Sequence, residues 1–286
     1  MSKVFVRIQG GLGNQLFQYA FARSLSDRGL RVFLHWHPAR KNEQHDGFLL
    51  DTIFEKRLTD FIPLANRSIT QFAMSFMFRK LNRVRQIGDV GFDKRFYDVN
   101  SGYIDGYFQS EKYFHNLKAE LSQELDISFE GKKYPAFLMG LIKKNFCVAI
   151  HVRGGDYLKI NGVNQVCGSV YYQNAIQRIS SSFRDKDTRF IVFTDDMAWA
   201  LKVLPRDITY SFASGFPGSS TGTDFALMKA CDAHIISNST FSWWGAWLSD
   251  SVSVIMPDRW YVSDSSSSNN DIKPDGWHEV PSTYFL

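Results

Sequence analysis

Apolar and polar positions along this chain alternate between two periodicities. Short runs rich in β-branched and aromatic residues predict strands, and stretches with helical spacing separate most of them. The predicted strands are 4–8, 31–36, 146–152, 190–193, 234–236 and 252–256. The predicted helices are 15–28, about 68–85, 111–125, 171–183, 196–204, 224–231 and 241–249. This alternation favours an α/β fold with parallel sheets.

The rhythm of strands and helices is regular from about residue 146 onward and looser before it. This asymmetry predicts two halves, of which the C-terminal one is the better-formed doubly wound unit. We therefore expect an N-terminal α/β domain over residues 1–140 and a C-terminal Rossmann-like domain over residues 141–286. A chain of this length can form two domains of modest size.

Composition narrows the classes of function. Apolar residues make up 44% and charged residues 22%, as in globular proteins. The balance of 33 basic and 29 acidic residues, a net charge of +4, is too small to indicate nucleic-acid binding. The three cysteines lack metal-binding spacing and are expected to be reduced thiols. With neither a signal segment nor an apolar run near the roughly 20 residues of a membrane span, we expect a cytoplasmic protein.

One segment, residues 70–86, is first apolar and aromatic and then strongly basic. A basic amphipathic helix can bind an anionic membrane surface. The favoured interpretation is a core-packed helix with a solvated basic end, and peripheral contact with the inner membrane is the second hypothesis.

A glycine-rich turn, residues 10–15 (GGLGNQ), follows the first predicted strand. Its position is typical of a dinucleotide-binding turn, but its spacing differs, and Asn14 and Gln15 occupy the place where backbone approaches a pyrophosphate. The second predicted strand is followed by His37 and Pro38, where an NAD-binding fold has an acidic residue. An NAD-dependent enzyme is therefore disfavoured.

The sequence HVRGGDY, residues 151–157, lies at the end of the strongest predicted central strand. Ligands of open α/β sheets bind at the carboxyl ends of strands, and His151 and Arg153 alternate onto one side of this strand. The planar guanidinium of Arg153 suits a phosphate. A buried histidine with an Arg–Asp pair bracing the turn is the structural alternative. Three polar groups and two glycines in one turn favour a functional site.

A second candidate is NSTFSWWGAWL, residues 238–248, between a predicted strand and a predicted helix. Hydroxyl side chains and free backbone N–H groups at a helix N-terminus form an anion site. Ser239, Thr240 and Ser242 could therefore bind a diphosphate, while Phe241 and the three tryptophans pack or stack. A capped core helix is the alternative.

Acidic residues supply the third candidate. Asp224 lies about one helix before this anion site, at the carboxyl end of a plausible strand. There it could accept the N1 and N2 protons of guanine, or it could be an acidic residue that the dipole of a helix N-terminus favours. For Asp195 and Asp196 a helix N-terminus is the favoured explanation. The only Asp-x-Asp pattern, residues 185–187, contains a lysine in a predicted surface turn, so no metal is expected.

These stretches together resemble the α-1,2-fucosyltransferases of glycosyltransferase family 11. The matching segments are GGLGNQLFQYAFARSL (10–25), GYFQSEKYF (106–114), HVRGGDY (151–157), FTDD (193–196), DFALMKACDAHIISNSTFSWWGAWLS (224–249) and, more loosely, PDGW (274–277). The resemblance implies a GT-B-type fold of two Rossmann-like halves, the C-terminal half binding GDP-L-fucose. It also implies metal-independent, inverting transfer to the 2-hydroxyl of a terminal galactose.

The resemblance further implies roles for single residues of the C-terminal half. Arg153 would bind the β-phosphate of the donor, with His151 beside it, and Asp224 would bind guanine sixteen residues before Thr240. From its place beside Arg153 in the sequence, rather than from the resemblance, Asp156 is expected to act as the base toward the acceptor or, as the favoured role, to hold Arg153. One departure stands out, since the family's second arginine is Gly154 here.

For the opening turn, Gly11 and Gly13 would admit a close approach, and the amides of Asn14 and Gln15 would contact the fucose or the β-phosphate. We thus expect the turn to form the opposite wall of the sugar-nucleotide site. The implied acceptor is a β-galactoside, oligosaccharide or lipid-linked, in O-antigen and lipopolysaccharide synthesis. Fucose transfer in another linkage (α-1,6 or protein O-linked) and a catalytically weak carbohydrate-binding protein are the alternatives.

Overall fold

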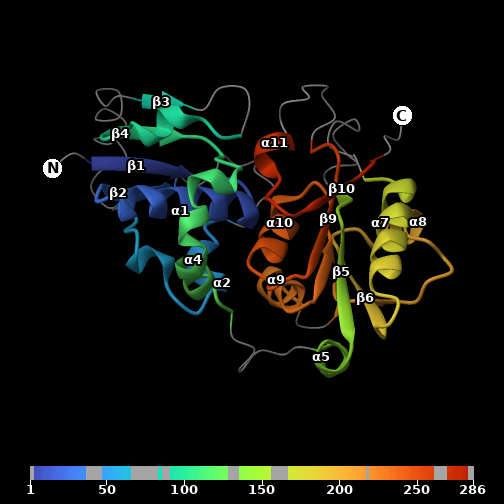
Figure 1. Cartoon of the computed structure of the whole chain (residues 1–286). Coiled ribbons are helices and arrows are strands. Elements are labelled where there is room, and N and C mark those ends of the chain that lie inside the picture. Colours follow the sequence, from blue (N-terminus) through green and yellow to red (C-terminus); the bar gives the residue numbers. More distant parts are fainter. Residues whose placement is uncertain are drawn as a thin grey trace. The chain divides into compact units, whose positions relative to one another are not determined.

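The computed structural model describes residues 3–36, 47–65, 83–85, 91–127, 135–155, 167–216, 219–260 and 269–282. The chain divides into two compact units, Met1–Ile127 with Asn270–Ile272, and Ser128–Asn269 with Lys273–Leu286, here called unit 1 and unit 2 (Figure 1). This division precedes the boundary predicted at 140/141. Helix α5 (Ala136–Lys144), which spans the predicted boundary, therefore lies entirely within unit 2.

Unit 1 contains a four-stranded parallel sheet in the order β2-β1-β4-β3. Helix α1 connects β1 to β2 and packs against both. Val4, Val6 and Ile8 of β1 are buried, while Phe5 stacks on Phe33 of the neighbouring strand. The strands are β1 (Lys3–Ile8), β2 (Arg31–Trp36), β3 (Arg83–Arg85) and β4 (Gly102–Asp105), and the first helices are α1 (Leu12–Asp27) and the short α2 (Leu50–Ile53).

The continuous helix predicted over 111–125 is wrong, because its first part consists of short 3-10 turns. The chain leaves the helical conformation at Phe114, with φ −148°. Tyr113 and Phe114 are both buried, against Phe21 and Phe17 of α1 respectively, and one regular helix face could not bury two adjacent rings in this way. The observed elements are 3-10 turns at Glu111–Tyr113 and His115–Leu117, then α4 (Lys118–Glu124).

The basic segment 70–86 lies largely outside the described residues. Its described part, Arg83–Arg85, forms β3 and pairs with Tyr103–Asp105 of β4, so the helix predicted to extend to residue 85 is wrong there. None of the helices in the described ranges is long and apolar enough to cross a lipid bilayer.

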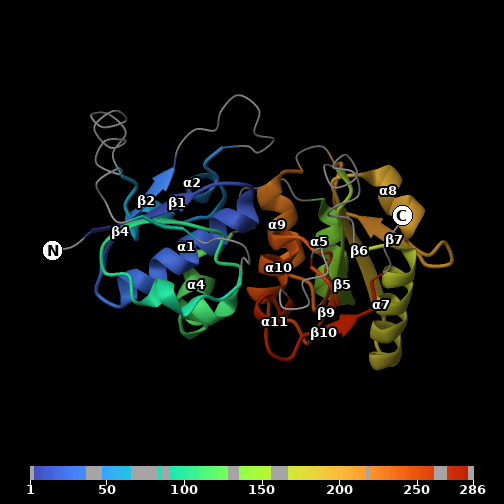
Figure 2. The ribbon, with the colours of Figure 1, turned by 90° about the horizontal axis from the view of Figure 1, so that it is seen from above.

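Unit 2 contains a six-stranded parallel sheet in the order β10-β9-β8-β5-β6-β7. Helices α7 and α8 lie on one face of this sheet, and α9 and α10 lie on the other (Figures 1 and 2). The strands are β5 (Phe146–Val152), β6 (Thr188–Thr194), β7 (Tyr210–Phe212), β8 (Ala233–Ile235), β9 (Ser253–Pro257) and β10 (His278–Val280). The helices are α7 (Ser169–Ser182), α8 (Met197–Val203), α9 (Thr221–Lys229), α10 (Thr240–Trp247) and the short α11 (Asn269–Ile272), which unit 1 shares.

Each of the two units is an α/β unit with a parallel sheet. This confirms the predicted fold class, a GT-B-type chain of two Rossmann-like halves. Strands β2 and β5 have the predicted bounds, and the other predicted strands differ by one or two residues. Strands β3, β4, β7 and β10 were not predicted, because each has only three or four residues and such short runs carry little periodicity.

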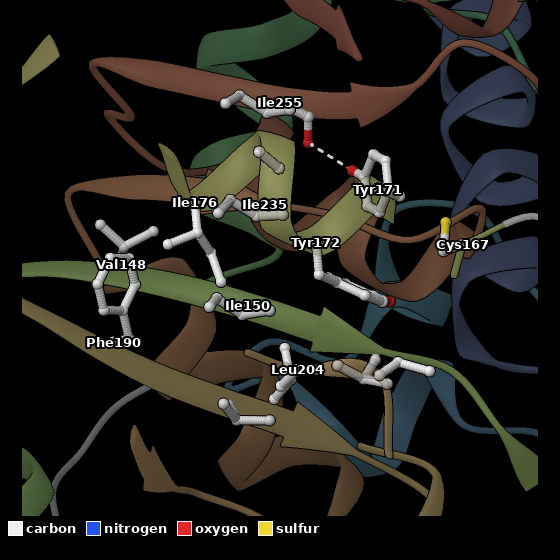
Figure 3. Close-up of a cluster of buried hydrophobic side chains, with 14 of the residues drawn as sticks. Val148, Ile150, Cys167, Tyr171, Tyr172, Ile176, Phe190, Leu204, Ile235 and Ile255 are labelled. Carbon is white, nitrogen blue, oxygen red and sulfur yellow. Dashed lines mark hydrogen bonds between the residues drawn. The ribbon is translucent and has the colours of Figure 1, made fainter. Parts of the chain in front are cut away.

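Side chains of β5 alternate between the two cores of unit 2. Val148 and Ile150 join the cluster under α7 and α8, together with Tyr171 and Tyr172 (Figure 3). The Tyr171 hydroxyl donates to the carbonyl oxygen of Ile255, which ties α7 to β9. By the same alternation, odd-numbered residues of β5 face α9 and α10.

All three cysteines of the chain lie in unit 2, and all are buried and unbridged. Burial raises the pKa of the Cys147 thiol to about 11 and raises the pKa of Cys167 and of Cys231 as well. All three therefore carry a protonated, solvent-shielded thiol near neutral pH.

Candidate active site

The carboxyl edge of the unit 2 sheet gathers the polar groups that follow β5 and β6. The guanidinium of Arg153, just after β5, pairs with Asp195, just after β6, at 2.9 Å. The same carboxylate accepts the backbone N–H of Gly154 at 2.8 Å. Asp195 thereby fixes both the arginine and the turn that carries it. Arg153 keeps 26% of its side chain exposed, which leaves the cation accessible at the sheet edge.

Asp196, the neighbour of Asp195, has a different role. Its carboxylate accepts the backbone N–H of Trp199 at 2.9 Å and caps α8. The predicted helix N-terminus is therefore confirmed for Asp196. For Asp195 that prediction missed the bond to Arg153.

His151 is buried near the end of β5. Its Nδ1 lies 2.8 Å from the Ser237 hydroxyl, and its carbonyl oxygen accepts from the Tyr172 hydroxyl at 3.0 Å. Burial and the nearby charge of Arg153 lower the pKa of His151 to about 3. The imidazole is therefore neutral near pH 7 and adds no positive charge for a phosphate.

Gly154, where the family has its second arginine, is tightly enclosed. A Cβ at this position would lie 2.6 Å from Cβ of Asp196 and 3.1 Å from Cβ of Trp199. Both neighbours belong to the capped first turn of α8, so they have little room to move. In this structure a larger side chain at 154 requires the helix to shift.

We expect Gly154→Ala and Gly154→Arg to destabilise the protein by about 1–3 kcal/mol, and Gly154→Arg to give no gain in transfer rate. Thermal unfolding measures the first effect and a transfer assay the second. Gly140→Ala is the matched control, since its Cβ would meet nothing within 4 Å and alanine favours the surrounding helix α5. An unchanged melting temperature for Gly154→Arg, with faster transfer, would contradict the packing argument.

Asp224 lies in the first turn of α9 at the same edge. Its Oδ2 accepts from the Ser214 hydroxyl at 3.0 Å, and the Ser214 oxygen in turn accepts the backbone N–H of Thr194 at the end of β6. Its Oδ1 is buried and has no hydrogen-bond partner among the described residues. Burial raises the pKa of Asp224, against the lowering effect of the Ser214 bond. A buried acceptor without a donor is costly, and a ligand N–H would satisfy it.

Helix α10 starts directly after Ser239, whose side chain makes no capping hydrogen bond. The first intrahelical bond is donated by the N–H of Trp243, so the three preceding N–H groups are not used within the helix. The Ser242 hydroxyl donates to the carbonyl oxygen of Ser239 and is fully buried. Backbone N–H groups of Thr240, Phe241 and Ser242, rather than the Ser242 hydroxyl, are thus the donors this end can offer to an anion.

The aromatic residues of this segment serve packing. The ring of Phe241 lies between His151 and Phe225, at centroid distances of 5.7 Å and 5.5 Å. Trp243, Trp244 and Trp247 are buried against one another. Of the two predicted roles, packing is the one these rings fill here.

In unit 1 the glycine turn is shorter than predicted, because α1 begins at Leu12 instead of Gln15. Gly10, at φ +77°, makes the turn, Gly11 precedes the helix, and Gly13 lies within it. The Gln15 amide donates to the carbonyl oxygens of Gly10 and Gly47, at 2.9 and 2.7 Å, and accepts from the backbone of Leu49. Both of its N–H donors are occupied, so Gln15 holds the turn instead of offering a donor to a ligand.

Asn14 is the more available amide of this turn. Asn14 lies directly over Gly10. A Cβ added to residue 10 would be 2.8 Å from Nδ2 of Asn14, and with the positive φ of residue 10 this close contact favours glycine there. Oδ1 of Asn14 accepts from Nε2 of Gln109 at 2.9 Å. In the part of the chain that the structure describes, no protein group accepts from its Nδ2.

The remaining sequence predictions concern Asp156, the partners of Arg153 and Asp224, and the use of a metal. Asp156 lies outside the described residues, and its role as base or as partner of Arg153 stays a prediction. Asp195 and Ser214 were not predicted as site residues, although Asp195 stands within FTDD, directly after a predicted strand. Among the described residues, no group of three or more His, Cys, Asp or Glu side chains could hold a metal ion. Metal independence stays a prediction.

Comparison with known proteins identifies the chain's family. Residues 65–280 match the family described as glycosyl transferase family 11. The chain belongs to glycosyltransferase family 11. It is therefore a glycosyltransferase, and the carboxyl edge of unit 2, with Arg153 and Asp224, is its candidate active site.

Three relatives of this family 11 chain are similar over different lengths. An α-1,2-colitosyltransferase from Escherichia coli is 30% identical over 98% of this chain and 99% of its own length. The O-antigen biosynthesis glycosyltransferase WbnK, also from Escherichia coli, is 27% identical over 94% and 98%. A bovine galactoside 2-alpha-L-fucosyltransferase, SEC1, is 31% identical over 54% of this chain and 44% of its own length. The bacterial relatives thus match nearly end to end.

Proposed function

We propose that this chain transfers L-fucose from GDP-L-fucose to the 2-hydroxyl of a terminal galactose, in α-1,2 linkage with inversion and without a metal. The acceptor would be a β-galactoside of a surface polysaccharide such as an O-antigen. The names of the bovine and bacterial relatives support this sugar, linkage and setting. The cytoplasmic location, with or without peripheral membrane contact, stays a prediction from the sequence.

The observation that carries the proposal is the buried, unpartnered Oδ1 of Asp224. Guanine presents two neighbouring N–H donors, N1 and N2, which a carboxylate can accept together. The Ser214 hydroxyl fixes the other oxygen, so the carboxylate is preoriented for a donor on the side of Oδ1. Adenine lacks this pair of donors, because its ring N1 is an acceptor that would face the carboxylate beside the single amino donor.

Bond cleavage determines what the rest of the edge must do. The bond from the anomeric carbon to the diphosphate breaks with its electron pair leaving on GDP. The galactose 2-hydroxyl oxygen forms the new bond and loses its proton to a base, the role predicted for Asp156, or to water. Donors directed at the developing phosphate charge are the largest catalytic contribution expected here. Arg153 and the first N–H groups of α10 are the groups of unit 2 suited to that charge.

Colitose is the second candidate for the sugar transferred. It is the 3-deoxy counterpart of fucose, and the colitosyltransferase matches this chain over nearly its full length. Both donors would share the guanosine diphosphate contacts described above. They differ in one hydroxyl, which a site built to bind it would distinguish strongly.

A transfer assay with both donors tests the proposal. We expect GDP-fucose, or alternatively GDP-colitose, to be transferred to lactose, lacto-N-biose or Galβ1,3GalNAc, with the α-1,2 linkage shown by NMR of the product. Transfer should persist in EDTA. A 2-deoxygalactoside is the matched control acceptor and should receive nothing, because it lacks the reacting oxygen.

Three outcomes would contradict this proposal. A product of another linkage would show a different fucosyltransferase, and a dependence on added divalent metal would refute the metal-independent mechanism. No GDP binding in calorimetry, together with no transfer from either donor, would indicate a carbohydrate-binding protein.

A further inference from the structure

The loop that follows β4 in unit 1 holds a buried aromatic residue in an unusual backbone conformation. Phe108 has φ +53° and is the only non-glycine residue with positive φ in the described ranges. A bulky residue rarely adopts this left-handed region, and such strain occurs preferentially at functional sites. The ring of Phe108 is fully buried, stacked on Phe21 of α1 at 4.0 Å and enclosed by Phe96 and Tyr113.

This conformation determines where the next residue points. The N–H of Ser110 donates back to the carbonyl oxygen of Phe108 at 2.8 Å, which closes a tight turn around Gln109. At the start of the loop, directly after β4, the carbonyl oxygen of Gly106 accepts from the Gln18 side chain at 3.1 Å. The Gln109 side chain, 6% exposed, is thereby held over the first turn of α1, where its Nε2 donates to Oδ1 of Asn14.

The bond from Gln109 determines the orientation of a second amide. A carboxamide can turn over and exchange its oxygen with its nitrogen, so an isolated Asn14 could present either atom to a ligand. With Oδ1 engaged by Gln109, Asn14 presents Nδ2, which has no acceptor in the described residues. Its side chain is only half-buried, so this donor is accessible.

We propose that Gln109 is a positioning residue, which orients the Asn14 carboxamide so that its NH₂ group donates to an oxygen of the substrate. The inference rests on the proposed function and on the sequence prediction that Asn14 contacts the fucose or the β-phosphate. The strained turn at Phe108 holds the positioning residue in place. Gln109 acts on the reaction through its bond to Asn14.

A double-mutant cycle tests this dependence. Gln109→Leu removes the donor with little change in volume, and we expect kcat for transfer to fall about tenfold, the value of one well-placed hydrogen bond. In an Asn14→Ala background the same substitution should change kcat less than about twofold, because the group it orients is gone. A loss that multiplies in full with that of Asn14→Ala would overturn the proposal, as would an unchanged kcat for Gln109→Leu alone.

The KM values show which substrate Asn14 contacts. If KM of Asn14→Ala rises only for the nucleotide sugar, the oxygen that accepts from Asn14 belongs to the donor substrate. If KM rises only for the galactoside, that oxygen belongs to the acceptor substrate. Gln123→Leu, the same substitution at an exposed position of α4, is the matched control and should leave kcat, both KM values and the melting temperature unchanged.

Gln109→Glu gives a readout that a purely structural role would not move. Its carboxylate cannot donate to Asn14, whereas its protonated form can. We expect a low kcat near neutral pH that recovers toward the wild-type value as the pH falls. If the bond ran in the other direction, from Asn14 to Gln109, the carboxylate would accept it equally well, and undiminished neutral activity would overturn the proposal.

Failure of the proposed function is detected separately. A wild-type chain that transfers neither sugar contradicts the function, and the orientation is then tested by NMR of the Asn14 side-chain ¹⁵NH₂ pair, assigned by its loss in Asn14→Ala. Gln109→Leu should shift this pair and Gln123→Leu should not. A pair unmoved by Gln109→Leu would overturn the proposal, and the same spectra apply if Gln109→Leu loses activity through misfolding.

Discussion

Replacement of Arg153 by alanine should lower kcat for transfer about 10²- to 10³-fold, the usual effect of removing one donor that stabilises developing charge. The leaving diphosphate would lose its fixed cation, and Asp195 would stay at the same edge without its partner. Neutral His151 could not replace the lost charge. Steady-state kinetics with saturating donor measure the loss.

Two variants refine this test. Arg153→Lys should recover little, because an ammonium lacks the planar fork that binds two oxygens at once. Arg189→Ala is the matched control, since Arg189 forms an exposed pair with Asp187 near the start of β6, away from the carboxyl edge. If Arg153→Ala turned over like the wild type, Arg153 would not be the phosphate ligand.

Asp224→Asn should weaken GDP binding about 10- to 100-fold, as expected when a hydrogen bond to a charged group, worth about 1.5–3 kcal/mol, is lost. Calorimetry with GDP and ADP measures this effect. The preference for GDP over ADP should shrink together with the affinity. Asp207→Asn, at an exposed position after α8, is the control and should bind GDP as the wild type does. Equal GDP affinity for Asp224→Asn and the wild type would exclude Asp224 as the guanine ligand.

The raised pKa of Asp224 adds a pH dependence of known sign. Without ligand, the native state favours the protonated carboxyl, so this group makes the protein less stable as the pH rises through the raised pKa. Guanine N–H groups favour the ionised carboxylate instead, so GDP affinity should increase over the same range. Both trends should be absent from Asp224→Asn, and a wild-type affinity that falls with rising pH would contradict the assignment.

The sequence predicted those parts of the fold that local periodicity specifies. Strand β5 appears with its predicted bounds because six of its seven positions are apolar. The break at Phe114 depends on two adjacent rings that both enter one core, which no local spacing encodes. Strand β7 is too short to show a pattern, and Ser214, which follows it, was missed for that reason.

The candidate site shows the same limit at single residues. Asp195 and Asp196 are adjacent and chemically identical, and only the pairing of β5 with β6 determines that one binds Arg153 while the other caps α8. Likewise, Asn14 and Gln15 are neighbouring amides, but the early start of α1 turns Gln15 toward residues 47–49 and leaves Asn14 available.

The placement of the three cysteines allows local opening of the chain to be measured by alkylation of its own thiols. All three thiols lie buried in unit 2, and unit 1 contains none. Alkylating reagents require an exposed thiolate, so each modification records a transient opening of unit 2 alone. Counting the alkyl groups by mass spectrometry therefore tests whether added GDP or a sugar nucleotide protects unit 2 from opening, with no dye or engineered label.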